Sequence, residues 1–412
     1  MQHTQARVIL STSYYVFFTL VIMESLRMIN SVGAYGVLEA MANDLGIGID
    51  RAQMVMIAPF LFGLVLGQLF SGMLSDRFGR MTLFILFLNI YAIASLLCFI
   101  FKDKTFFMWF RLMTGFTGAI SELTVRAILA DYCDLKLSAR LFSRICGLSA
   151  IIIGLSPLLM NHLSQLLGWR SFFVFNAIVC CTVSALALYL VKTFDNKINK
   201  QALTGRYLLC NFNYTLVSGT YLMLCGFFVL SAIIMQFSFA LLPMMVINYF
   251  KLSSTTLSLI VGILSGLVFW ASAQTNSWLV TRYSMLSIIR LAFIITWVCS
   301  VLHPALFILN DDYLKLVLFL ADFFIGIFAE NIIFINLFML ATQSADKRVG
   351  NGFVTSLTIA LFTLGMVFSS TLGAFVGIKQ VSIAYALYAL FVTLCLALYL
   401  VAIPNLRERL GM

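Results

Sequence analysis

Several ionisable residues interrupt long apolar stretches of this sequence. They are Glu24, Arg27, Arg111, Glu122, Arg126, Asp322 and Glu330. A charge inside a membrane-spanning helix is costly, and it usually marks a proton site, an ion path or an ion pair. Residues three or four apart lie on the same face of a helix, so Glu24 can pair with Arg27. Glu122 can pair in the same way with Arg126.

Glu24 has two interpretations, and the residues leave both open. In the structural one, an ion pair with Arg27 fixes this helix to a neighbour. In the functional one, Glu24 is a proton site. Burial disfavours the charged form of a carboxyl group, whereas a nearby arginine favours it, so the charge of Glu24 depends on the partner it faces.

Arg111 has no carboxylate close to it in sequence, so it needs a partner from another helix or from water. Its role is either proton coupling or a structural hydrogen bond in the helix core. Glu122 lies on almost the same face, about 16 Å further along the helix axis. The order of Glu122 and Arg126 is the favourable one for a helical ion pair, which we interpret as structural.

The apolar stretch at 314–340 supplies four further polar candidates, Asp322, Glu330, Asn331 and Asn336. Glu330 lies near its middle, so we expect it to face a cavity or a partner and not lipid. It is the second candidate, after Glu24, for binding a proton or substrate. Gln236 in the stretch 219–247 is equally consistent with helix packing.

The composition is that of an integral membrane protein. The chain has 412 residues, of which 62% are hydrophobic and 10% are charged, with a mean hydropathy of +1.03. A soluble core of this size cannot hide so much apolar surface. The net charge of +10 does not indicate nucleic-acid binding, because the basic residues punctuate apolar runs instead of forming a patch.

No metal or other cofactor is expected apart from protons as the coupling ion. The nine cysteines lie mostly inside apolar runs and lack metal-ligand spacing, so they are interpreted as small packing residues. His162 and His303 lie near predicted outer helix ends, where we expect solvated roles at the membrane interface.

Apolar runs between polar segments predict an all-α membrane protein with twelve transmembrane helices. Their approximate ranges are 8–33, 51–74, 81–101, 105–130, 141–163, 172–191, 219–247, 256–279, 285–309, 314–340, 353–375 and 382–403. A polar stretch divides these helices six and six. We therefore expect an N-terminal bundle at 1–191, a cytosolic linker at 192–213 and a C-terminal bundle at 214–412.

The distribution of Lys and Arg predicts the orientation, because these residues are retained on the cytosolic side. If the N terminus is inside, the predicted inner segments hold sixteen of them and the outer segments hold seven. Both termini are therefore expected in the cytosol. No phosphate-binding Gly-x-x-x-x-Gly-Lys-Ser/Thr loop occurs, so an ATP-driven pump is not expected.

A polar turn of nine residues separates the second and third predicted helices. It contains Gly72, Asp76, Arg77, Gly79 and Arg80. Glycine permits close backbone approach or a positive φ, and the arginines favour the cytosolic face. A weak copy of this turn follows the eighth predicted helix, where it keeps only the arginine, Arg282.

This turn, between two of twelve helices split six and six, resembles the loop signature of the major facilitator superfamily. Arg111, followed by Gly115 and Gly118, resembles a second family motif, an intramembrane arginine with close-packing glycines. The segments Arg126 to Asp131 and Leu167 to Phe173 are similar to the Bcr/CflA branch of drug:proton antiporters, which includes multidrug and chloramphenicol exporters.

The resemblance implies roles for three of these features. Multidrug members of the branch carry a membrane-embedded acid in the first helix, which corresponds to Glu24. Arg111 would take part in proton coupling. The turn would latch the two halves in one conformation, with Asp76 meeting a helix terminus or an arginine near the start of the eleventh helix.

The fifth predicted helix departs from the antiporter signature of this branch. Gly147, Gly154 and Pro157 remain, and the missing backbone donor of Pro157 favours a bend. Ser156 precedes the proline, however, and Met160-Asn161 stand where a glycine pair is expected. We therefore expect the continuous small-residue face of this helix to be lost.

The leading prediction is a proton-coupled secondary transporter that exports amphiphilic small molecules by alternating access. The alternatives are an importer or a metabolite or siderophore porter of the same fold and, more remotely, a non-transporting membrane receptor. We do not expect an enzyme, because no paired catalytic motif occurs. The expected setting is the lipid bilayer of a bacterial inner membrane, with a monomeric protein that binds no nucleic acid.

Overall fold

The computed structural model describes residues 14–132, 135–194, 218–345, 351–376 and 381–410. Every regular element in these ranges is a helix. The N-terminal half consists of α2 (Tyr14–Gly33), η1 (Ala34–Val37), α3 (Leu38–Leu45), α4 (Ile49–Met56), α5 (Ala58–Phe78), α6 (Arg80–Ile100), α7 (Lys104–Tyr132), α8 (Leu135–Leu167) and α9 (Ser171–Phe194).

The C-terminal half is also built from helices. It consists of α11 (Gly219–Pro243), η2 (Met244–Tyr249), α12 (Ser254–Leu259), η3 (Ile260–Leu264), α13 (Ser265–Leu279), α14 (Met285–Ala305), η4 (Leu306–Ile308), α15 (Asp312–Ser344), α16 (Asn351–Val376) and α17 (Val381–Leu410). The η1 and η4 segments are 3₁₀ turns, whereas η2 and η3 are π-helical.

Ten helices within the described ranges are long and apolar enough to cross a membrane, or eleven if the bent pair Tyr14–Leu26 and Ile29–Leu45 counts as one span. Charged residues make α7 less apolar, but it packs along both α5 and α6 as a further helix of the bundle. The predicted twelve-helix, all-α membrane fold is therefore confirmed.

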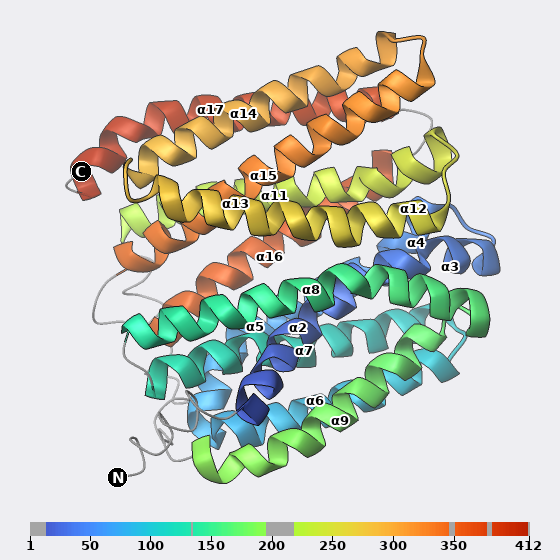
Figure 1. Cartoon of the computed structure of the whole chain (residues 1–412), viewed down its shortest axis with the longest axis vertical. Helices are drawn as coiled ribbons and strands as arrows, with labels where there is room; N and C mark the ends of the chain where they lie inside the picture. Colours follow the sequence, from blue (N-terminus) through green and yellow to red (C-terminus); the bar gives the residue numbers. More distant parts are fainter. Residues whose placement is uncertain (1–13, 133–134, 195–217, 346–350, 377–380, 411–412) are drawn as a thin grey trace.

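The two halves lie side by side, with the N-terminal helices below and the C-terminal helices above in Figure 1. They meet where α5 packs against α16 and where α8 packs against α12, η3 and α13. We refer to the end of the bundle with α3, α4 and the α14–α15 connection as the distal end. The C terminus lies at the opposite, proximal end (Figure 1).

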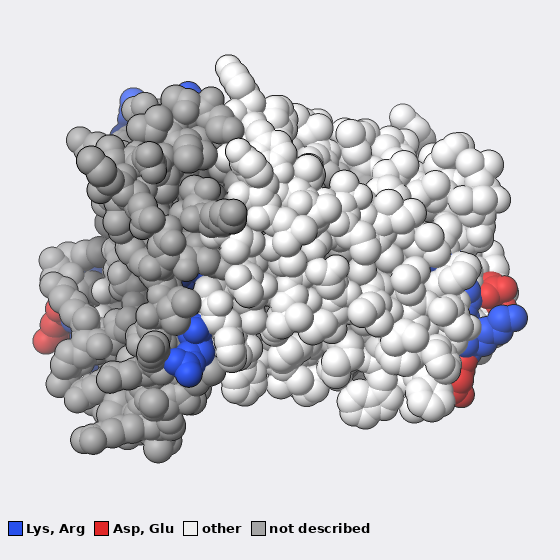
Figure 2. Space-filling view, turned by 90° about the horizontal axis from the view of Figure 1, so that it is seen from below, with Lys and Arg blue, Asp and Glu red and all other residues white. Residues whose placement is uncertain are grey.

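The outer surface of the bundle is apolar across its middle. Figure 2 shows one side of the molecule on which the central region is free of charged side chains, with acidic and basic groups at the distal end. On α17, Leu387, Leu390, Leu394 and Leu398 are each more than half exposed at helical spacing. A soluble protein rarely exposes such a continuous apolar face, whereas lipid accommodates it.

The predicted nine-residue turn at Gly72 to Arg80 is wrong in extent. Helix α5 continues to Phe78, and α6 begins at Arg80, so Gly79 alone separates the two helices. The helix persists because Ser71 and Ser75, one turn apart, both remain buried against the core. Gly79 has φ 93°, a conformation that side chains other than glycine rarely adopt.

Candidate functional site

Glu330 is a buried acid in the middle of α15, only 3% exposed. Its Oε1 atom accepts hydrogen bonds from the Ser238 hydroxyl of α11, at 3.2 Å, and from the Tyr388 hydroxyl of α17, at 3.0 Å. Oε2 has no hydrogen-bond partner among the described residues. The acid is therefore held by neutral hydroxyl groups, and one of its oxygens remains available.

A second buried acid, Asp322, lies two turns before Glu330 on α15 and pairs with His303 of α14. The Nδ1 atom of His303 also lies 3.1 Å from the Cys299 carbonyl oxygen. The imidazole stacks on the Tyr385 ring of α17, with centroids 4.6 Å apart. The expected solvated position of His303 is therefore wrong, because three helices enclose its ring, while His162 is exposed as predicted.

Asn331 and Asn336 follow Glu330 by one and six residues but face a different helix. The amide of Asn331 donates to the Ser272 hydroxyl and to the Phe269 carbonyl oxygen of α13. The amide of Asn336 donates to the Asn276 side chain, also on α13. These two residues join α15 to α13, and they lie apart from the hydroxyl groups around Glu330.

Arg111 lies in the N-terminal half, completely buried in α7. Its Nε atom donates to the Met56 carbonyl oxygen at 2.8 Å, and its guanidinium lies over the Phe60 ring at 4.6 Å from the centroid. The rings of Phe172 and Phe173 are within 5.8 Å. Nη1 and Nη2 have no hydrogen-bond partner in the described part of the chain.

The remaining candidates of the N-terminal half are less completely described. Glu24 is half-buried on α2, which packs against α7 and α8. The side chains of Arg27, Glu122 and Arg126 lie outside the described residues, so both predicted ion pairs remain predictions.

The signature residues of the fifth helix lie at the contact between the halves. Gly154 of α8 meets Gly262 of η3 so closely that a methyl group on Gly262 would lie 3.2 Å from the Gly154 carbonyl carbon and closer still to its oxygen. Pro157 flanks the same contact, at 3.3 Å from that methyl position. Gly154 and Pro157 of α8 therefore make a close contact with Gly262 of the other half, while the loss of the small-residue face at Met160-Asn161 remains a prediction. Gly147 lies in α8 and outside the described side chains.

Two polar contacts join the halves beside this glycine pair. The amide of Asn161 donates to the Thr255 hydroxyl of α12 at 3.0 Å. Gln236 of α11 is buried and hydrogen-bonds to Tyr35 of η1. Asn161, one of the two residues in place of the expected glycine pair, thus bonds the halves near the distal end.

The residues of the predicted gating turn lie at the proximal end of α5. Arg80 donates from Nη1 to the Ser75 hydroxyl at 2.9 Å, and Arg77 is half-buried. The side chain of Asp76 is outside the described residues, and so are the side chains of residues 351 and 352 at the start of α16, the helix that it was expected to meet. The latch therefore remains a prediction.

The Gly168-Trp169-Arg170 segment closes the distal end of the N-terminal half. Arg170 donates to the carbonyl oxygens of Cys98 and Phe101, at 3.0 and 3.1 Å, and so caps the last turn of α6. Trp169 donates to Asp44 at 2.8 Å. Partial burial lowers the pKa of Arg170, and the nearby Asp44 carboxylate counteracts this effect.

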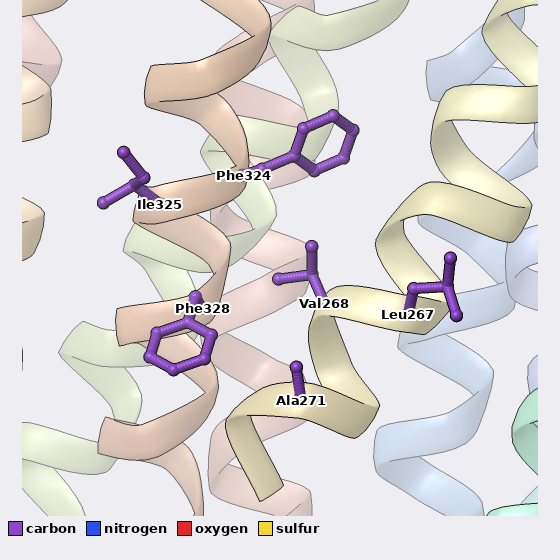
Figure 3. A pocket seen from close by; sticks show the side chains of 6 residues that line it. All are labelled: Leu267, Val268, Ala271, Phe324, Ile325 and Phe328. Carbon is purple, nitrogen blue, oxygen red and sulfur yellow. The ribbon is translucent and has the colours of Figure 1, made fainter. Parts of the chain in front are cut away.

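A groove of about 380 Å³ lies between α13 and α15 (Figure 3). Its lining is entirely apolar: Leu267, Val268, Ala271, Phe324, Ile325 and Phe328. Leu267 is 58% exposed and Ile325 is 52% exposed, so the groove opens on the outer surface of the bundle. It contains none of the candidate site residues. Within the described ranges no group of His, Cys, Asp and Glu residues could hold a metal ion.

Residues 20–355 match the sequence pattern of the Major Facilitator Superfamily. The chain belongs to this superfamily. Two solved superfamily-like transporters have the same fold at low sequence identity. The D-xylose-proton symporter superimposes with a TM-score of 0.71 at 13% identity, covering 94% of this chain and 97% of that one. The POT family transporter PepTSo gives 0.74 at 12% identity, covering 95% and 98%.

Relatives within the superfamily include proteins named multidrug resistance protein MdtL. The one from Shigella dysenteriae serotype 1 is 27% identical over 173 residues, which is 40% of this chain and 44% of that protein. The one from Escherichia coli strain K12 / DH10B is 28% identical over 138 residues, 34% of this chain and 35% of the relative. The match thus spans less than half the length of these relatives. Relatives and structural neighbours alike are transporters and not enzymes.

Proposed function

We propose that this superfamily member is a proton-coupled exporter of amphiphilic small molecules that works by alternating access. Protons are the coupling ion, and Glu330 is the principal proton and substrate site. The proposal rests on the superfamily match and on the similarity to multidrug resistance proteins. The observation that carries it furthest is the setting of Glu330, a buried carboxyl group with hydroxyl partners and, among the described residues, no Lys or Arg bonded to it.

The burial of Glu330 gives a physical reason for exchange. An ionised carboxylate that is removed from water without a cation costs several kcal/mol, so the closed bundle disfavours it. A proton on Glu330 removes this cost, and a positively charged group on a bound substrate offsets it. The transporter therefore does not close while Glu330 is ionised and has no substrate bound. It changes conformation only when Glu330 carries a proton or a substrate.

Arg111 and Glu24 have supporting roles in this proposal. Arg111 supplies a permanent positive charge in the N-terminal half, because an arginine does not lose its proton in a protein. Glu24 is a second site at which a proton or a substrate charge binds. The chain is rich in Phe and Met, and these adaptable apolar side chains suit amphiphilic substrates of varied shape.

The topology completes the proposal. The excess of Lys and Arg in alternate loops supports a cytosolic proximal end, with both termini inside, in the inner membrane of a bacterium. The distal end then faces the outer aqueous phase, which supplies the protons. The transporter is proposed to work as a monomer, because each chain carries both halves.

Everted membrane vesicles test the direction and the coupling together. With an acidic lumen, the wild-type protein is expected to accumulate ethidium, an amphiphilic cation, and collapse of the pH gradient should release it. Glu330→Gln is expected to abolish this accumulation, since the amide cannot take up a proton. Glu408→Gln, a change at an exposed glutamate of α17, is the matched control.

Two outcomes would contradict the proposal. Expulsion of ethidium from vesicles with an acidic lumen would favour an importer or a metabolite porter. Accumulation by Glu330→Gln at the rate of Glu408→Gln would remove Glu330 from the coupling mechanism.

A further inference from the structure

We propose that His303 and Asp322 form a proton relay that delivers protons from the distal end of the bundle to Glu330. This inference rests on the proposed proton-coupled function. The relay is a pair of titratable side chains inside the C-terminal half, and one of them, His303, lies in the last turn of α14 at the distal end.

The contact between His303 and Asp322 allows the two side chains to share one proton. Nδ1 of His303 contacts Oδ2 of Asp322, so a proton between them belongs either to the imidazole or to the carboxyl group. His303 is 6% exposed and Asp322 is 8% exposed, so both side chains are buried. Histidine is the side chain best suited to gain and lose a proton near neutral pH.

The position of the pair connects it to Glu330. Asp322 and Glu330 are both buried on α15, about 12 Å apart along the helix axis. Cys299 lies one turn before His303 on α14, and its carbonyl oxygen is 3.1 Å from the His303 Nδ1 atom.

Helix α17 spans the same interval with two tyrosines one turn apart. Tyr385 stacks on His303, and Tyr388 donates its hydroxyl proton in a hydrogen bond to Glu330. No arginine or lysine bonds to either acid within the described residues. The nearest cation along α15, Lys315, donates instead to Tyr249 and Asp312 at the distal end, at 2.9 and 3.0 Å.

In the proposed transfer, one bond to hydrogen breaks as another forms. When the distal end opens, a proton from the outer aqueous phase binds the His303–Asp322 pair. The N–H bond of the imidazolium, or the O–H bond of the Asp322 carboxyl, then breaks as an O–H bond forms at Oε2 of Glu330. The interval is longer than one hydrogen bond, so water admitted on opening carries the proton across it.

The alternative to a relay is a purely structural ion pair between α14 and α15. Two assays on purified protein in liposomes distinguish these two hypotheses. Exchange of labelled against unlabelled ethidium at equal pH moves only the substrate-loaded carrier. Transport driven by a pH gradient also requires protons to reach Glu330. A lost relay slows the second process alone, whereas a lost structural pair slows both.

For His303→Gln we expect gradient-driven transport to fall by on the order of tenfold or more, as for the loss of a positioned proton carrier. Exchange should change by less than about twofold, because no proton is transferred in that assay. The dependence of the driven rate on pH at the distal side should flatten. His162→Gln, at the exposed histidine of α8, should behave like the wild type in every assay.

Equal losses in exchange and driven transport, or no loss in either, would overturn the relay while leaving Glu330 as the proton site. Asp322→Asn provides the second test and keeps the shape of the pair if His303→Gln does not fold. Wild-type protein that exchanges ethidium but is not driven by a pH gradient would overturn the proposed function and the relay with it.

Discussion

At the scale of single residues, Glu330 and Arg111 are buried charges with different surroundings. Glu330 is held by two hydroxyl groups, and its charge disappears when a proton binds. Arg111 keeps its charge and is stabilised by the Met56 carbonyl oxygen and the face of Phe60. The acid is therefore the group whose charge changes during transport, and the arginine is a fixed cation of the N-terminal half.

Arg111→Lys is expected to lower the thermal unfolding temperature of the purified protein. A lysine ammonium is strongly hydrated and lacks the planar surface that stacks on Phe60, so we expect a cost on the order of 2–4 kcal/mol. Arg144→Lys, at an exposed site on α8, is the control. Equal unfolding temperatures of the two variants would show that the aromatic setting of Arg111 contributes little.

The sequence identifies the buried charges but not their partners. Asp322 and Glu330 stand out because acids are rare in apolar runs. Ser238 and Tyr388 are ordinary residues of helices that lie far away in the chain, so no local pattern connects them to Glu330. His303 was misplaced because it lies one turn from the end of α14, while its partner Asp322 lies ten residues inside α15.

At the scale of helices, the contact between α8 and η3 governs how closely the two halves approach. Gly154 and Gly262 allow backbone to meet backbone, with Pro157 beside them. From the sequence, Met160-Asn161 in place of a glycine pair predict that the continuous small-residue face of the fifth helix is lost. The sequence could not show that Gly154 meets a glycine, because its partner, Gly262, belongs to the other half of the chain.

Gly262→Val is expected to separate the halves at this contact and to favour the distal-open conformation. Overpacking of this kind costs about 1–3 kcal/mol in the closed state, which shifts the conformational equilibrium by about fivefold to 150-fold. Labelling of a cysteine introduced at Thr255 by a water-soluble maleimide should accelerate accordingly. Gly226→Val, where a side chain meets only open space, should leave labelling unchanged, and equal labelling of both variants would contradict the account.

Arg170→Ala is expected to destabilise the distal end of the N-terminal half. The change removes two charged hydrogen bonds to the carbonyl oxygens at the end of α6, worth about 1–3 kcal/mol in total. Amide hydrogen exchange in the last turn of α6 should speed up. Arg282→Ala removes an arginine that stacks on Trp278 and is exposed, so unchanged stability is expected there, and a larger loss than in Arg170→Ala would contradict this view.

Most helix boundaries were predicted to within about four residues, because the thickness of the membrane fixes the length of each apolar run. Helix α8 begins at Leu135 and α17 ends at Leu410, six residues before and seven residues after the predicted boundaries. The Gly72–Arg80 turn was also predicted too long. Its polar residues suggested a loop, but buried Ser71 and Ser75 keep the segment helical until Gly79. Charged residues near the end of an apolar run therefore did not mark the end of the helix.

At the scale of the whole molecule, the halves are joined near the distal end by the bond between Asn161 and Thr255. In alternating access this contact must break for the site to open outward. A disulfide between Asn161→Cys and Thr255→Cys should therefore stop both exchange and driven transport, and a reducing agent should restore them. Each single cysteine variant should remain active, and undiminished transport by the cross-linked protein would exclude opening at this contact.

The central claim is that Glu330 carries either a proton or the charge of the substrate. The most direct test is the pH of a weakly buffered solution of purified protein as ethidium is added. The account predicts that wild type and Glu408→Gln release protons in proportion to ethidium bound, whereas Glu330→Gln binds ethidium more weakly and releases none. Proton release by Glu330→Gln equal to that of the wild type would contradict it.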